Sequence, residues 1–452
     1  MPSVKLGKNL LLLPALLGTA ALVRAGPATA QTATERIEAL QRQMEEMQRT
    51  FEQQLRAMQA EIDAMREREE EIATRLPPPP VGDERDLPYS SAVNQTLSTT
   101  KPLFSIAPGE TRVSLSGQVN RAINVANDGD TTKAYFVDND VSNSRLRVLG
   151  VAGITEDIGI CGQFELAFSP NNSSEVSQDN EDTGDDFLDD RRVEVAFNSL
   201  RYGRVWLGKG SGAADDTAEF DLSGTDVIMY SGVADIVGGL QFTDGGDLTG
   251  VTVADAFFNL DGGRYDRVRY DSPVIGPGLQ ASASWGEDQR YDLALNWGGD
   301  FGNWTGVEIG PFTTIGAIAL WDPSESGVDY NLDGSFSALH NPTGLSLTLS
   351  AGVQEADGAN RPYNLYGKLG WQTAFFDFGD TRFGTDVTQG RQNLELEDGA
   401  ERTAEGWSVG AAAVQAVSDY GLELFAQGRW FTVDQDGFND IIVGTVGSRL
   451  KF

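Results

Sequence analysis

From Thr111 to the C-terminus, the sequence alternates apolar and small polar residues with a period of two. This period is that of a β-strand, because a helix repeats every 3.6 residues. A strand with one apolar and one polar face is suited to lie between lipid and a watery lumen. Arg121 falls on the apolar side, so we expect it at a subunit contact or past a β-bulge. In the first run the apolar set is Val113, Leu115, Val119, Ile123 and Val125, and the polar set is Ser114, Ser116, Gln118, Asn120 and Asn124.

The same alternation recurs between short clusters of Gly, Asn and Asp, with no long helical pattern beyond residue 110. A barrel whose two ends lie on one side of a membrane needs an even number of strands. We therefore predict an all-β fold, a 16-stranded antiparallel transmembrane β-barrel over 111–452. The first run and the following sixteen make seventeen candidates, of which 237–244 or 327–338 is expected to be loop: 144–154, 158–169, 190–198, 203–210, 237–244, 264–273, 279–288, 289–299, 313–322, 327–338, 344–355, 362–373, 379–389, 405–418, 421–433 and 439–452.

The first thirty residues have the pattern of an export signal. Lys5 and Lys8 precede the apolar run 10–17, and Ala28-Thr29-Ala30 offers small residues for cleavage. We predict a signal peptide over 1–30. An uncleaved anchor is the alternative, and Arg24, near the end of the apolar stretch, disfavours it.

Residues 31–76 have a different period from the rest of the chain. Apolar residues follow 3-4 spacing with one extra step of four, which is a heptad stripe with a stutter. This pattern predicts a periplasmic α-helical coiled coil of roughly 60 Å at 1.5 Å per residue; a lone amphipathic helix on a membrane surface is the alternative. Four prolines, 77–80, end it and open a Pro/Ser/Thr-rich linker over 77–110. The stripe consists of Ile37, Leu40, Met44, Met47, Phe51, Leu55, Met58, Ile62, Met65, Ile72 and Leu76.

The chain carries 34 Lys and Arg against 67 Asp and Glu, for a formal net charge of −33. A protein that binds nucleic acid neutralises phosphates with basic residues. The strong acidity therefore argues against a nucleic-acid partner.

Residues 201–226 combine a strand with a long acidic segment, which is too polar for a core element and too long for a tight turn. This combination resembles a Gram-negative outer-membrane porin, in which a GxxxLGK strand precedes an acidic loop that folds into the barrel. The run 144–157 and the terminal Phe452, with Leu450 on the same face, are further marks of the resemblance. The resemblance covers about 111–452 and implies a homotrimer.

By this resemblance, acidic loop residues face basic residues on the barrel wall across a constriction, and the field between them sorts solutes. The loop residues are Asp215, Asp216, Glu219 and Asp221; the wall residues are Arg145, Arg147, Arg192, Arg267 and Arg269. The resemblance also implies that Phe452 and Leu450 form a signal for the barrel assembly machinery. These charges could instead solvate strand ends and an external loop.

Other candidate chemistry is sparse. The acidic run 179–190 departs from the EF-hand pattern, so a calcium site there stays an open alternative. His340 is the single histidine and lies in a turn sequence, while Cys161 has no partner within the chain. We find no nucleophile motif, phosphate loop or Cys/His metal spacing, and we predict neither an enzyme nor a cofactor.

The sequence therefore predicts a trimeric outer-membrane porin that passes small hydrophilic solutes and ions passively, narrowed by the 211–226 loop. The expected partners are outer-membrane lipid and lipopolysaccharide, the barrel assembly machinery, further copies of the chain, and the cell wall through the coiled coil. One alternative is a structural barrel that tethers the outer membrane to the cell wall. Others are a barrel enzyme and an exported β-sandwich or lectin. A weak cation preference is expected from the loop acids.

Overall fold

The computed structural model describes residues 108–184, 188–276, 278–300, 312–324, 327–356, 361–395 and 401–452. The chain divides into two units, 1–85 and 86–452, and every described residue belongs to the second. The predicted signal peptide, the coiled coil and the linker up to residue 107 therefore lie outside the described residues. Within the described part of the chain, no helix is long and apolar enough to cross a membrane.

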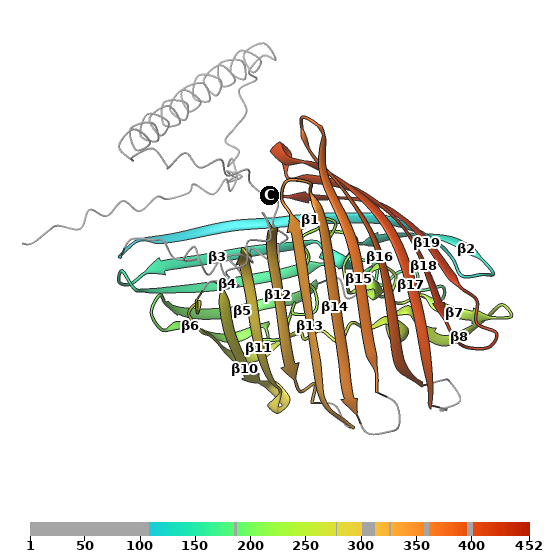
Figure 1. Cartoon of the computed structure of the whole chain (residues 1–452), viewed down its shortest axis with the longest axis horizontal. Coiled ribbons are helices and arrows are strands. Elements are labelled where there is room, and N and C mark those ends of the chain that lie inside the picture. The colour runs from blue at the N-terminus through green and yellow to red at the C-terminus, as the bar shows by residue number, and fades with distance from the viewer. Residues whose placement is uncertain are drawn as a thin grey trace, which may run out of the picture. The chain divides into compact units, whose positions relative to one another are not determined.

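The described chain is almost entirely strand, as the period-two pattern predicts (Figure 1). The main sheet contains β1 (Thr111–Asn127), β2 (Thr132–Asp138), β3 (Arg145–Gly153), β4 (Ile158–Phe168), β5 (Leu188–Ser199), β6 (Gly203–Ser211), β9 (Arg264–Asp271), β10 (Leu279–Gly286), β11 (Tyr291–Asp300), β12 (Phe312–Trp321), β13 (Val328–His340), β14 (Leu345–Ala356), β15 (Tyr363–Phe376), β16 (Gly379–Glu395), β17 (Glu401–Val417), β18 (Leu422–Val433) and β19 (Ile441–Lys451).

The sheet closes on itself into a barrel. All its strand pairs are antiparallel, and β19 pairs with β1 from Gln118↔Lys451 to Asn127↔Ile442. Strands β2 and β3 both pair with β1, along different parts of its length, and so share one position in the wall. The 17 strands of this sheet thus occupy sixteen positions. The predicted 16-stranded antiparallel transmembrane barrel is confirmed.

The two doubtful candidates have different outcomes. Segment 327–338 belongs to the barrel as β13, whereas 237–244 overlaps β7 (Gln241–Asp244), which pairs only with β8 (Asp247–Thr252) in a separate two-stranded sheet. The sequence pattern missed β2. Its seven residues follow β1 after a tight turn, in which Asp128 Oδ1 accepts the N–H groups of Asp130 and Thr131.

Exposure alternates along the strands as the two-faced pattern requires. On β14, the residues Leu345, Leu347 and Leu349 are exposed on the outer face, while Ser346 and Thr348 are buried on the inner face. The parity assigned to β1 is observed from Gln118 to Ala126, while residues 111–116 are exposed on both faces. Tryptophan departs from a simple interfacial arrangement, because Trp206 and Trp321 share the inward parity of their strands and donate Nε1–H to Asp271 and Asp333 at 3.0 and 2.9 Å.

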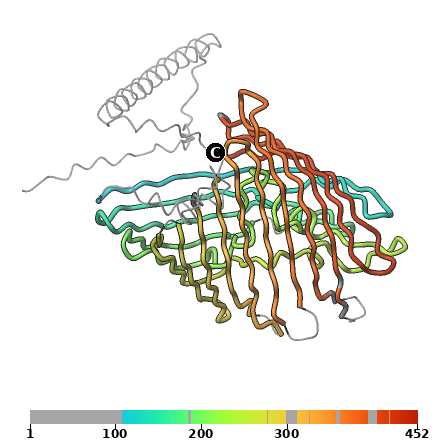
Figure 2. The backbone as a smooth tube through the Cα atoms, viewed as in Figure 1, coloured from blue at the N-terminus to red at the C-terminus, as the bar shows by residue number. Residues whose placement is uncertain are grey.

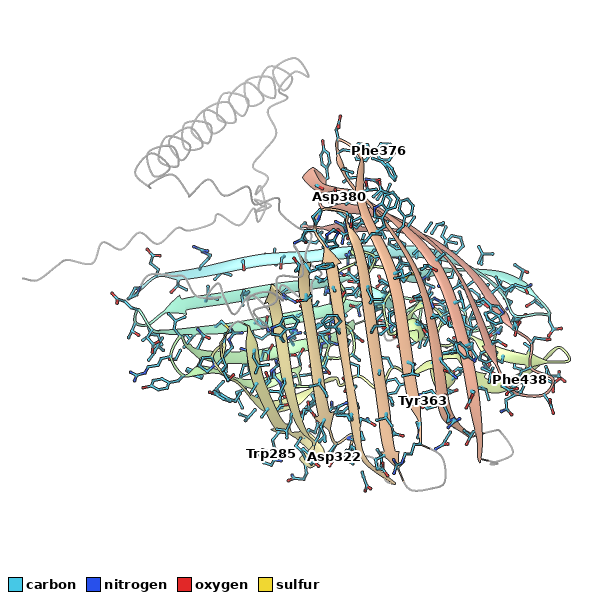
Figure 3. The ribbon with its side chains drawn as sticks, viewed as in Figure 1. Trp285, Asp322, Tyr363, Phe376, Asp380 and Phe438 are labelled. Carbon is cyan, nitrogen blue, oxygen red and sulfur yellow. The ribbon has the colours of Figure 1, made fainter. Side chains whose placement is uncertain are left out.

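The two rims of the barrel differ. One rim, here called the turn end, carries Phe376 and Asp380; the opposite rim, the loop end, carries Trp285, Asp322, Tyr363 and Phe438 (Figure 3). The C-terminus lies at the turn end (Figure 1). At the turn end, neighbouring strands are joined by short turns such as His340–Gly344. Gly344 has φ +70°, and a Cβ there would lie 1.9 Å from the carbonyl oxygen of Gln372, so the turn requires glycine at this position.

Residues 212–263, here called the insert, connect β6 to β9 through the interior of the barrel (Figure 2). The insert is much longer than the predicted 211–226 loop. It contains η3 (Val233–Ile236), the β7–β8 hairpin and α3 (Val253–Phe257), whose first turn is closed by a capping box between Thr252 and Asp255.

The insert brings an apolar cluster into the lumen. Its apolar residues pack against inward-facing apolar side chains of the wall, which would otherwise face water. From the insert come Val227, Ile228, Met229, Val233, Ile236, Leu240, Phe242 and Phe257; from the wall come Tyr135, Val137, Tyr366, Val414, Phe425, Phe431, Val433, Ile441 and Val443.

A charge on the outer face should destabilise the barrel. Leu349 lies midway along β14, is 48% exposed, and pairs with Phe336 and Gly367 on the neighbouring strands. We expect Leu349→Arg to lower the free energy of unfolding by about 2–4 kcal/mol, the cost of a cation near the bilayer midplane. Urea unfolding in lipid vesicles measures this loss, with Leu349→Ala as the control for lost volume. Equal losses in the two variants would contradict a lipid-facing position.

Candidate functional site

The site begins with arginines gathered around Glu165 on the inner wall. The Glu165 side chain is 1% exposed. Its Oε2 accepts from Arg147 Nε at 2.5 Å and its Oε1 from Arg191 Nε at 2.9 Å, while Arg145 Nη1 lies 3.9 Å from Oε1. One buried carboxylate thus holds arginines from β3 and β5 together, and it neutralises only part of their charge.

A β-bulge places two consecutive arginines on this wall. Between β4 and β5, Glu165 pairs with Arg192 and Leu166 pairs with Asp190, so Arg191 is the extra residue. A bulge re-aims side chains that strict alternation would send to opposite faces. Arg192 Nη2 donates to Ser211 Oγ at 2.7 Å, and its Nη1 lies 3.4 Å from Glu194 Oε1.

The opposing side consists of carboxylates on the first part of the insert. Asp215 accepts a hydrogen bond from the Ser211 hydroxyl, and its Oδ2 lies 3.5 Å from Arg264 Nη2. Burial tends to raise the pKa of Asp215, but Arg264 and Ser211 outweigh it and hold the pKa below its ordinary value. Glu219 accepts from Asn259 Nδ2 at 3.0 Å, and burial together with neighbouring Asp216 raises its pKa well above the usual range.

A third side comes from a break in the barrel wall between β2 and β3. Here η1 (Asp140–Ser142) folds inward, and the wall residues Gln118 and Asn120 donate side-chain hydrogen bonds to the carbonyl oxygen of Ser142 at 2.8 and 2.9 Å. These bonds satisfy backbone that has left the sheet. The Asp140 carboxylate accepts from Ser174 Oγ at 2.7 Å.

These three sides enclose a cavity of about 310 Å³. The ionisable groups that line it come from distant parts of the chain and are brought together by the barrel. The wall contributes Arg145, Glu165, Arg191, Arg192 and Arg264; the insert contributes Asp215, Asp216, Glu219, Asp226, Tyr230, Asp235 and Asp261; η1 contributes Asp140.

The other predicted residues lie beside this cavity rather than on it. Arg147 is bound to Glu165, and Arg267 Nη2 donates to Glu194 Oε2 at 2.5 Å. Arg269 donates from Nε to Asp271 at 2.8 Å and from Nη1 to the carbonyl oxygen of Gly212 at 2.6 Å. These arginines share the inward parity that the sequence predicts.

Asp221 belongs to the attachment of the insert to the wall. Lys368 Nζ donates to Asp221 Oδ2 at 2.5 Å and to the carbonyl oxygen of Met229 at 2.6 Å. Ser335 and Ser337 on β13 accept the N–H groups of Phe220 and Leu222 through their hydroxyls at 3.0 and 2.9 Å. The residues predicted from the sequence thus include some that line the cavity and others, such as Asp221, that anchor the insert to the wall.

At the chain end, Phe452 exchanges backbone hydrogen bonds with Gly117 at 2.8 and 3.0 Å, and Leu450 is exposed on the outer face. In the acidic run 179–190, residues 185–187 lie outside the described residues. Its other acids contact neighbouring side chains, as in Glu181 with Lys133 Nζ at 2.8 Å and Asp190 with Lys209 Nζ at 2.7 Å.

Several residues that line the cavity were not predicted from the sequence. They are Asp140, Arg191, Asp235, Asp261 and Arg264. Arg191 is brought onto the wall by the bulge, and Asp235 and Asp261 lie beyond residue 226, where the loop was expected to end. The signal that could have found the latter two is the same acidic, glycine-rich composition, which continues to residue 263.

No protein-family model matches this chain, and no curated protein matches its sequence. Solved structures do match. An anion-selective porin from Comamonas acidovorans aligns with TM-score 0.51 and 14% identity, covering 76% of this chain and 100% of that chain. Salmonella typhi OmpF in complex with daunomycin aligns with TM-score 0.49 and 14% identity, covering 75% and 97%. The trimer form of in-vitro folded OmpT, an outer membrane protein of Vibrio cholerae, gives TM-score 0.47 and 13% identity, covering 76% and 99%.

The closed barrel, with its apolar outer face and charged inner face, is therefore a transmembrane barrel. The likeness to the Comamonas acidovorans structure shows that its fold is that of an outer-membrane porin.

The buried pair of Lys368 and Asp221 should hold the insert in place, since both side chains are at most 2% exposed. Lys368→Met leaves Asp221 buried without its cation, at a cost of about 3–5 kcal/mol to docking of the insert. We expect faster amide hydrogen exchange over 220–230, measured by mass spectrometry on protein in detergent. Lys368→Met combined with Asp221→Asn removes the uncompensated charge, keeps an acceptor oxygen for Ser223 and Thr348, and should restore protection. Unchanged exchange in Lys368→Met would contradict the anchoring role.

The cavity should change its charge near neutral pH. Burial and the adjacent Asp140 raise the pKa of Asp235 to about 7, while Tyr230, Arg191 and Arg264 favour its ionised form. Acidification from about pH 8 to about pH 6 therefore protonates Asp235 and removes negative charge from the cavity. We expect cation preference, measured from reversal potentials in a planar bilayer, to fall over that range. Asp235→Asn should flatten this dependence, and a response as steep as that of the native chain would contradict the assignment.

Proposed function

We propose that this protein is an outer-membrane porin that lets small hydrophilic solutes and ions diffuse passively through its lumen. The observation that carries the proposal is the cavity between the arginine wall and the acidic edge of the insert, inside a closed transmembrane barrel. Solute size and charge decide passage where a water-filled pore narrows between charged groups. One side of the constriction is formed by the acidic residues 215–219 of the insert, together with Asp235 and Asp261. The opposite side is formed by Arg145, Arg191 and Arg192.

The charge balance of the cavity supports a preference for cations. Its arginines already contact carboxylates, as in the Arg191–Glu165 and Arg264–Asp215 pairs. Asp140, Glu219 and Asp235 instead accept hydrogen bonds from the neutral Ser174, Asn259 and Tyr230. Where these carboxyl groups are ionised, they raise the local concentration of cations. Anion selectivity is stated for the Comamonas acidovorans porin and does not follow from the residues of this chain.

Self-association as a trimer is part of the proposal. Arg121 lies on the outer parity of β1 between the exposed Val119 and Ile123, and its side chain is 41% exposed. It donates to the carbonyl oxygen of Pro170 at 2.9 Å and lies 3.6 Å from Asp138. A cation in contact with lipid tails costs about 2–4 kcal/mol, so a neighbouring subunit would be a better environment for it. In this arrangement Phe452 and Leu450 serve assembly, and the coiled coil lies in the periplasm.

The described residues that could act as nucleophile or base support a channel rather than an enzyme. The single histidine, His340, is at the end of β13 and contacts Thr343 Oγ1 at 2.7 Å. Cys161 is 3% exposed and packs with Val151 and Ala196 on the wall. The histidine and the thiol therefore lie on separate elements and do not form a nucleophile–base pair with each other.

The function is tested by changing Asp215, Asp216 and Glu219 together to Asn, Asn and Gln. Because all three line the cavity, we expect the reversal potential under a salt gradient to shift towards anions. The measurement is made in a planar bilayer on residues 31–452, with conductance steps arriving in threes for a trimer.

Asp247→Asn is the control, because Asp247 is on the exposed tip of the β7–β8 hairpin, away from the cavity. Steps with an unchanged reversal potential in the triple variant would remove the insert from the constriction. Native protein that folds and gives no steps would overturn the porin proposal and favour the tethering barrel.

A further inference from the structure

The last residues of the insert, which lead back to the barrel wall, form hydrogen bonds with the acidic residues at its start. Asp261 Oδ2 accepts the N–H of Asp216 at 2.8 Å, and its Oδ1 accepts the N–H of Ala218 at 2.7 Å. Asn259 Nδ2 donates to Glu219 Oε1 at 3.0 Å. The return segment (residues 259–261) thus holds the acidic turn (residues 215–219) through three hydrogen bonds. The bonded residues are 40 to 45 positions apart in sequence, so the contact exists only in the folded insert.

The return segment is itself fixed to the barrel. Trp321 Nε1 donates to the carbonyl oxygen of Leu260 at 3.2 Å, and Leu260 is completely buried. Gly352 on β14 makes room for it, because a Cβ there would lie 2.9 Å from Leu260 Cβ. Leu260 also has φ +60°, a backbone conformation that its packing must maintain. The return segment therefore fixes the acidic turn relative to the barrel wall.

Backbone strain and charge repulsion both oppose the shape of the acidic turn. Asp216 has φ +71°, in the left-handed region, and the turn carries three carboxylates within five residues, which repel one another. Two further bonds come from the wall: Thr217 Oγ1 donates to Asp333 Oδ1 at 2.5 Å, and Ser335 Oγ donates to the carbonyl oxygen of Thr217 at 2.6 Å. A carboxylate that accepts two backbone N–H groups fixes both peptide planes.

We propose that Asp261 is a positioning residue for ion selectivity, which holds Asp216 and Glu219 at the edge of the cavity. This inference rests on the proposed porin function and deepens it. Asp261 acts through its two hydrogen bonds, which determine where the acidic turn places its carboxyl groups relative to a passing ion. Asp261→Asn keeps the size of the side chain, but its amide offers one acceptor oxygen, and its NH₂ group faces the second N–H.

The test is a double-mutant cycle on reversal potential in a planar bilayer. Asp216→Asn combined with Glu219→Gln is measured in the native chain and in the Asp261→Asn background. If Asp261 positions the turn, removing the two charges should shift the reversal potential by less than half as much in the Asp261→Asn background. Equal shifts in the two backgrounds would show that Asp261 does not position the two carboxyl groups, and would overturn the proposal.

Asp226→Asn provides a matched control, because Asp226 also lies on the insert and lines the cavity but is not part of the return segment. The same pair of changes should give equal shifts with and without Asp226→Asn. If the shift in reversal potential is also reduced in the Asp226→Asn background, loss of charge alone explains the reduction, and the positioning role is contradicted.

Two further measurements separate this proposal from its premises. Amide hydrogen exchange over 215–219 should rise in Asp261→Asn while exchange in β13 and β14 stays unchanged, so a misfolded barrel is recognised directly. Exchange over 215–219 that stays unchanged would overturn the positioning role. If native protein gives no conductance, the porin function fails; conductance with equal shifts in the cycle overturns only the role of Asp261.

Discussion

The structure depends on the need to satisfy every backbone hydrogen-bonding group within a lipid environment. A strand in a bilayer has no water to pair its edge, so the sheet must close on itself. Here the closure is made by β1 and β19, with the terminal Phe452 continuing the pairing to Gly117. The break between β2 and β3 obeys the same requirement from the inside, since Gln118 and Asn120 bond the backbone that leaves the sheet.

A closed barrel of sixteen positions encloses more space than its own side chains fill, and the insert occupies much of it. The insert divides the interior by chemistry. Its apolar side packs against β17, β18, β19 and the neighbouring wall, and its acidic edge faces the arginines of β3, β5 and β9. Burial of apolar surface stabilises one side of the insert, so that its other side can present carboxyl groups to the lumen.

The electrostatics of the cavity follow from which charges are paired. Glu165 holds several arginines with one carboxylate, which concentrates basic groups on one wall without leaving them isolated. Across the cavity, hydrogen bonds from neutral groups and backbone hold the acids in place. Arginines on one side and ionised carboxylates on the other give a local field across the cavity, which is the basis of the proposed selectivity.

The period-two pattern by itself determined the fold class and the face that each strand presents, because a two-residue repeat leaves no choice of side. The strand number needed in addition the rule that a barrel with both ends on one side of a membrane has an even number of strands. The pattern also placed Arg145, Arg147, Arg267 and Arg269 towards the lumen. Tertiary structure alone decided which charges meet. A single-residue bulge brought Arg191 onto the wall, Lys368 drew Asp221 away from the cavity, and the return of the insert brought Asp261 against Asp216. Such contacts join residues that are tens to more than a hundred positions apart, and local alternation carries no information about the path of a long connection through the barrel.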